Sequence, residues 1–130
     1  MKILTWKIRI SVLWIFMAVA MPAHSVLYFM GPGAIEEIEG MHMGVGMLFF
    51  MAIFWWVPLV MAVLSLILKD SANRWANFVL GIVFTILNIV HLITEQLAQP
   101  SAHQILIIGS TIVVTGLIAW FAWRWPKQQT

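Results

Sequence analysis

Four histidines are the residues of this chain best suited to chemistry, and two of them lie inside long apolar stretches. His24 lies in the stretch 10–30, and His91 lies in the stretch 76–97 with Glu95 one helical turn later. Residues four apart share one face of a helix, so His91 and Glu95 can hydrogen-bond to each other or hold one ion. Ionisable groups inside a membrane span are costly, and they therefore indicate a functional site.

Two helical faces carry these residues toward a common centre. Polar or small residues recur at steps of three or four in the stretch 76–97. In the stretch 10–30 a second series has the same spacing and consists of Trp14, Met17, Met21, His24 and Tyr28. Counted at about 1.5 Å per residue, His24 and His91 both lie roughly 9 Å below the outer helix ends. The sequence therefore predicts a ligand site made of His24, Tyr28, Asn88, His91 and Glu95.

A transition-metal ion is one ligand that these side chains suit. Imidazole with carboxylate suits zinc, iron or nickel, and thioether with imidazole suits copper(I). The predicted ligands are His24, His91 and Glu95, with His42 and Met47 nearer the mouth. The alternative for a methionine series at helical spacing is ordinary packing.

A haem between His24 and His91 is a less favoured cofactor. Its propionates would face an outer side that lacks Lys and Arg and carries several Glu, so the charges favour a cation or a neutral ligand.

The composition places these residues in a membrane. Of 130 residues, 62% are apolar and 9% are charged, against roughly 25% charged in a soluble domain. A spanning helix needs about 20 apolar residues, which leaves room for four spans and no soluble catalytic domain. The chain has no cysteine, which excludes disulfides and thiolate metal sites. We predict one transmembrane domain over residues 1–130, with spans at about 10–30, 43–68, 76–97 and 105–123.

Short connections determine the predicted arrangement of these spans. Neighbouring helices joined by short loops run antiparallel, and the stretches lack the alternation of barrel strands. The fold class is therefore all-α, an integral membrane four-helix bundle with up-down-up-down topology. We also expect one helical turn at 34–40, kinks at Pro22 and Pro58, and helix starts at Ser71 or Asn73 and at Ser101.

Charge gives the predicted orientation. All the basic residues fall on one side of the topology, whereas the histidines and all acids except Asp70 fall on the other. Under the positive-inside rule both termini are cytoplasmic. The basic residues are too dispersed for a nucleic-acid patch. They are Lys2, Lys7, Arg9, Lys69, Arg74, Arg124 and Lys127.

Three segments carry a family resemblance. Residues 11–16 (SVLWIF), 73–77 (NRWAN) with Gly81, and 119–126 (AWFAWRWP) together resemble a family of small bacterial four-helix membrane proteins of unassigned function. The resemblance implies a bacterial cytoplasmic (inner) membrane protein and implies no activity.

Three functional hypotheses follow. The first is an outward-facing polar pocket that binds a cation or small ligand, in a binding or transport role without enzymatic activity. The second is an accessory subunit of a larger membrane complex, or a homo-oligomer, in which the polar groups only join helices. The third is a lipid- or quinone-linked enzyme that uses His91 and Glu95 as acid and base.

Overall fold

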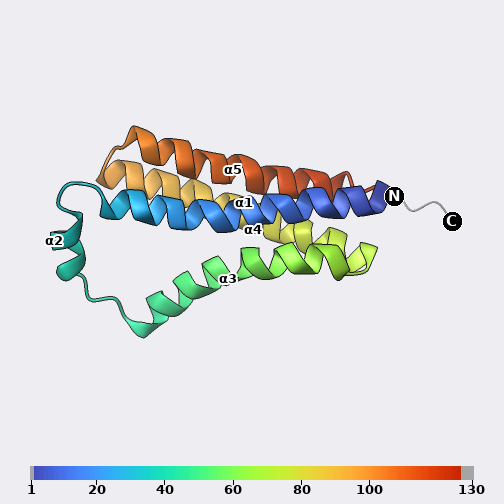
Figure 1. Ribbon diagram of the computed structural model, residues 1–130, viewed down its shortest axis with the longest axis horizontal. Coiled ribbons are helices and arrows are strands. Elements are labelled where there is room, and N and C mark those ends of the chain that lie inside the picture. The colour runs from blue at the N-terminus through green and yellow to red at the C-terminus, as the bar shows by residue number, and fades with distance from the viewer. Residues whose placement is uncertain (1, 127–130) are drawn as a thin grey trace.

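The computed structural model describes residues 2–126, and within this range the chain forms helices and no strands. The elements are α1 (Lys2–Phe29), α2 (Ala34–Glu39), α3 (Val45–Ile67), α4 (Asp70–Ala98) and α5 (Ala102–Trp123) (Figure 1). All except α2 are long and apolar enough to cross a membrane. The prediction of an all-α fold with four helices long and apolar enough to span a membrane is therefore confirmed. Lys127, one of the basic residues used for orientation, lies outside the described range.

Three of the long helices, α1, α4 and α5, begin before the apolar stretches that predicted them, whereas α3 lies within its stretch. α1 begins eight residues before the first stretch and α4 begins six residues before the third. Backbone hydrogen bonding does not stop where the side chains become polar, so hydropathy underestimates helix length. The expected cap at Ser71 or Asn73 is wrong, because α4 begins after Lys69 without a side-chain cap. The cap at Ser101 is confirmed, since its hydroxyl accepts from the Gln104 backbone N–H.

Apolar side chains join α1, α3, α4 and α5 into one core. α1 packs on both α3 and α5, and α4 packs mainly on α5. The Trp6 indole donates to the Phe121 carbonyl (2.7 Å), whereas His24 near the other end of α1 bonds to Gln104 near the start of α5. α1 and α5 therefore run antiparallel. The core contains Ile10, Trp14, Met17, Met21, Met61, Ala62, Phe84, Val114 and Ile118.

The two ends of this bundle differ in charge. We call the end formed by the start of α1, the end of α3, the start of α4 and the end of α5 the basic end, because it carries Lys2, Lys7, Arg9, Lys69, Arg74 and Arg124. The opposite end, with α2, is the histidine end. It carries His24, His91, His103, Glu95 and the acidic residues of α2.

Buried side-chain amides of α4 form hydrogen bonds to α1 and α3 near the basic end. The Asn77 Oδ1 accepts from the Trp14 indole (2.6 Å) and from the Ser65 hydroxyl (3.2 Å). The Asn73 amide in turn donates to the Ser65 carbonyl (2.7 Å). Asn73, Asn77 and Ser65 are fully buried. Three helices are thus joined by hydrogen bonds that water does not reach.

Gly81 allows α4 and α5 to approach closely in the middle of the bundle. A Cβ at this position would lie 2.7 Å from the Ala119 backbone nitrogen and 3.0 Å from its Cα. Such distances are well inside van der Waals contact, so only glycine fits here without moving a helix. This contact separates the buried amides near the basic end from the polar groups of the histidine end.

The first half of α3 diverges from the other helices. Figure 1 shows it running obliquely away from the bundle before its second half lies along α1 and α4. The buried residues of α3 all belong to the second half, beginning at Pro58, whereas residues 41–53 are exposed throughout. Pro58 lies inside the helix, where a proline removes a backbone hydrogen bond and favours a bend. The halves of α1 and α4 nearer the histidine end are therefore not covered by a described helix on this side.

Candidate metal centre

Three side chains from two helices converge at the histidine end. His24 comes from the last turns of α1, and His91 and Glu95 come from the last turns of α4. The centroids of the two imidazole rings are 4.9 Å apart and the rings are nearly perpendicular. One donor atom from each of the three residues lies within 4.8 Å of the others. The structure therefore brings together the three residues that the sequence analysis singled out first.

The Glu95 carboxylate lies between the two rings. Its Oε2 is 2.9 Å from the His91 Nε2 and 3.2 Å from the His24 Nε2. Despite these short distances, Oε2 is buried and receives no well-aligned hydrogen bond from any described residue. Donor atoms that share one tetrahedral zinc ion lie roughly 3.3 Å apart, given metal–ligand bonds of about 2.0–2.2 Å. The two spacings here, 2.9 and 3.2 Å, are close to this value and are also within the range of a hydrogen-bonded ion pair.

Gln104 fixes which nitrogen of His24 carries the proton. Its Nε2 donates to the His24 carbonyl (3.1 Å), which can only accept. The amide oxygen of Gln104 must therefore face the His24 Nδ1, 2.7 Å away. Because that oxygen can only accept, Nδ1 is the donor, and a neutral ring then presents the lone pair of Nε2 to Glu95. Holding the second nitrogen in this way is the usual means of orienting a histidine toward a metal.

This arrangement leaves a carboxylate facing an imidazole lone pair, which is repulsive without a positive charge between them. The described basic residues all belong to the basic end of the bundle, at the far end of the same helices. The side chains of His24 and Glu95 are only 11% and 17% exposed, so water screens them little. A proton on Nε2 or a bound cation satisfies both groups.

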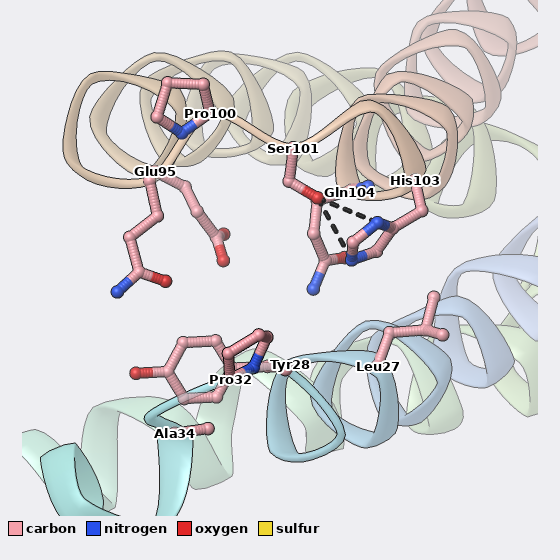
Figure 2. A pocket seen from close by; sticks show the side chains of 11 residues that line it. Leu27, Tyr28, Pro32, Ala34, Glu95, Pro100, Ser101, His103 and Gln104 are labelled. Atoms are coloured by element: carbon pink, nitrogen blue, oxygen red, sulfur yellow. Dashed lines mark hydrogen bonds between the residues drawn. The ribbon is translucent and has the colours of Figure 1, made fainter.

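A cavity of about 230 Å³ opens at the histidine end and reaches Glu95, the one residue of the cluster that lines it. Figure 2 shows Glu95 on one wall, with Ser101, His103 and Gln104 beside it and Tyr28 and Pro32 opposite. The segment between α1 and α2 forms one side of the opening, and the segment between α4 and α5 forms the other. An ion or small ligand can therefore reach Glu95 without crossing the packed core.

The other predicted ligand residues differ in their placement. Tyr28 lines the cavity. Asn88 is fully buried one turn below His91, where its amide group makes long contacts to the Thr111 carbonyl and the Thr115 hydroxyl (both 3.4 Å). Asn88 therefore joins α4 to α5 and is not one of the clustered donors.

His42 and Met47 are not brought to the cluster. His42 lies in the exposed segment before α3, and Met47 is 55% exposed on the diverging half of that helix. The expectation that span two would line the site assumed that it stays against the bundle along its whole length, which it does not. A haem also does not fit between His24 and His91, because the rings are in edge contact with a carboxylate between their Nε2 atoms.

Gln104 is the site residue that the sequence analysis missed. It is 3% exposed. The available signal was a polar side chain inside the first turn of the last span, where an apolar residue would otherwise be expected.

Comparison with known proteins finds no matching family model, no matching curated protein and no matching solved structure. Function must therefore be inferred from the geometry.

Proposed function

We propose that this protein binds a divalent transition-metal ion through His24, His91 and Glu95, in a site open to the histidine end of the bundle. The observation that carries the proposal is the approach of the His24 Nε2 to the Glu95 Oε2, at 3.2 Å, while Gln104 holds the proton on Nδ1. A metal ion accepts both lone pairs at once. The protein supplies three ligands and leaves at least one coordination position facing the cavity.

The donor set favours zinc or iron(II). Two imidazoles and one carboxylate are the ligands of many open zinc sites and of non-haem iron(II) sites. Copper(I) prefers soft thioether ligands, and Met47, which supported copper in the sequence, lies on the diverging half of α3.

We propose that the site binds the metal ion and does not conduct it through the bundle. Below the cluster, Asn88, Thr111 and Thr115 are buried and packed, and the close contact of Gly81 with Ala119 follows. A cation entering from the histidine end therefore meets a closed core. A receptor, storage or delivery role fits this better than a channel.

We place the protein in a bacterial cytoplasmic membrane with both termini inside and an up-down-up-down topology. The basic residues lie at one end of the bundle, and that end faces the cytoplasm under the positive-inside rule. The proposed site then opens outward. The resemblance to small bacterial four-helix proteins supports the same placement.

Metal titration of the detergent-purified protein tests the proposal. Zn²⁺ and Fe²⁺ are added separately to metal-free protein, and bound metal is measured by elemental analysis after desalting. We expect near-stoichiometric binding by the wild-type protein and its loss in the His24→Ala, His91→Ala double variant. His103→Ala is the matched control, because His103 lines the same cavity but lies outside the cluster.

Two results would contradict the proposal. One is the absence of stoichiometric binding of either metal by folded wild-type protein. The other is an equal loss of metal in His103→Ala and in the double variant, which would mean that binding needs histidines in general and not this cluster.

A second candidate function is that of an accessory subunit, and the divergence of α3 favours it. Both faces of residues 45–53 are exposed, including Phe49 at 66%. Lipid covers such a surface, and so does a helix of a partner or of a second copy. Crosslinking from a photoreactive residue at position 49 distinguishes these, since only a protein neighbour yields a discrete higher-mass band.

A further inference from the structure

The basic end carries a groove that the metal site does not involve. Phe78 of α4 and Gly116, Ala119, Trp120 and Trp123 of α5 line an open, largely apolar space of about 430 Å³. We call it the aromatic groove. Trp120 and Trp123 are each more than half exposed, so their rings form walls without closing the groove. Gly116 has open space where a side chain would lie, which gives the groove its depth.

Two arginines flank this groove, Arg74 in α4 and Arg124 directly after the end of α5. The Arg124 guanidinium lies over the Trp120 ring, 5.4 Å from its centroid. The Arg74 guanidinium lies over Trp75 at 5.4 Å and also donates to the Trp123 carbonyl (3.4 Å). Stacking on indole holds both cations in place while most of their N–H groups stay available.

Neither arginine has an acidic partner in the described part of the chain. Asp70 is the acidic residue of the basic end, and it pairs with Lys7 at 3.5 Å. The acids at positions 36, 37, 39 and 95 belong to the histidine end. The rim of the groove is therefore positive and its floor is apolar.

We propose that the aromatic groove binds an anionic phospholipid. One acyl chain lies along Gly116 between Phe78 and Trp120, and the headgroup phosphate lies between Arg74 and Arg124. Tryptophan and arginine at the end of a spanning helix lie at the depth of the lipid headgroups. The charged rim of the groove would then face the headgroups, and its apolar floor would face the acyl chains. A bidentate guanidinium recognises phosphate better than a point charge does.

Native mass spectrometry of the full-length protein tests this site. The protein, in mild detergent, is titrated with dioleoyl phosphatidylglycerol and, separately, with dioleoyl phosphatidylcholine. We expect a one-to-one complex with phosphatidylglycerol whose affinity is at least tenfold higher than that with phosphatidylcholine. The Arg74→Gln, Arg124→Gln double variant should lose this preference. Glycerol phosphate without acyl chains should not compete at millimolar concentration.

Arg9→Gln is the matched control. Arg9 also stacks on a tryptophan at the basic end, 5.3 Å from the Trp6 centroid, but neither residue lines the groove. We expect the affinity of the Arg9→Gln variant for phosphatidylglycerol to stay within twofold of that of the wild-type protein. Gly116→Leu fills the groove while leaving both arginines, and it should weaken binding at least fivefold.

Several outcomes would overturn the proposal. These are equal affinity for the two lipids, an equal loss in Arg9→Gln and in the double variant, and unchanged binding in Gly116→Leu. A dimer that replaces the lipid complex and disappears in Gly116→Leu would assign the groove to a second copy of the chain. None of these results depends on metal binding at the opposite end.

Discussion

The buried polar groups of α4 are satisfied in opposite ways toward the basic end and toward the histidine end of the bundle. Outside α4, the Trp125 indole nitrogen near the basic end is also buried without a hydrogen-bond partner among the described residues. At the basic end, Asn77 uses both its oxygen and its nitrogen in short hydrogen bonds to α1, α3 and α4. At the histidine end, the Asn88 Oδ1 and the Glu95 Oε2 are buried without a hydrogen-bond partner among the described residues. The α3 helix adds to this difference, because its second half packs beside the bonded amides near the basic end. Its first half diverges and does not cover the histidine end.

This contrast separates polar residues of α4 that stabilise helix contacts from those that could bind a ligand. A polar group inside a bilayer that is fully bonded stabilises helix contacts. One that is buried and unbonded lowers stability, and it needs a physical explanation, of which an ion or a water molecule bound to it is one. The α4 helix carries both kinds on the same face, which is why periodicity alone does not separate them.

The largest effect is expected from removing the bonded amide. Asn77→Leu leaves the Trp14 indole and the Ser65 hydroxyl without their acceptor, and we expect a loss of about 3 kcal/mol in the free energy of unfolding. Asn88→Leu is the control, because Asn88 is equally buried but makes only long contacts, and it should cost less than about 1 kcal/mol. Denaturant unfolding in micelles, followed by circular dichroism, measures both. Equal losses would remove the distinction between the two ends.

The contact between α4 and α5 gives the next largest effect. Gly81→Ala places a Cβ against the Ala119 backbone, which cannot move as a side chain can, and should cost about 2 kcal/mol. Gly116→Ala meets open space and should change stability by less than about 0.5 kcal/mol. The same unfolding assay compares them. A neutral Gly81→Ala would show that the helices separate easily, and the closed core inferred below the metal site would lose its support.

A smaller effect on stability but a clear effect on metal affinity is expected at Gln104. Gln104→Leu frees the His24 ring to turn, and we expect a 10–100-fold weaker affinity for zinc, as for other residues that orient metal ligands. Gln104→Glu keeps an acceptor for Nδ1 but loses the donor to the His24 carbonyl, so it should restore part of the affinity. Competition with a zinc-sensitive dye measures both variants. Equal weakening in the two would mean that Gln104 acts through packing and not through the His24 proton.

The smallest effect is expected on the diverging helix. His42→Ala and Met47→Leu should each change zinc affinity less than twofold, because neither residue is among the clustered donors. The same dye competition applies. A tenfold loss of zinc affinity in either variant would show that the first half of α3 closes over the site when the metal binds.

Sequence reasoning predicted the spans and the polar face of α4 because both depend on local spacing. It also selected His24, His91 and Glu95, since ionisable residues stand out in apolar stretches. The divergence of α3 could not be predicted, because residues 45–57 are apolar on every side and mark no inward face. The roles of Asn73 and Gln104 were missed for a related reason, since each depends on a partner distant in the sequence.

The depth of the cluster determines how a bound ion would respond to membrane voltage. His24 lies five residues before the end of α1, which corresponds to about 8 Å of helix. A divalent ion that crosses the whole bilayer changes energy by roughly 4.6 kcal/mol per 100 mV, and one that enters a quarter of the core by about 1 kcal/mol. Occupancy of the proposed site would therefore follow the metal concentration on the side of the membrane that the histidine end faces much more closely than it follows the membrane voltage.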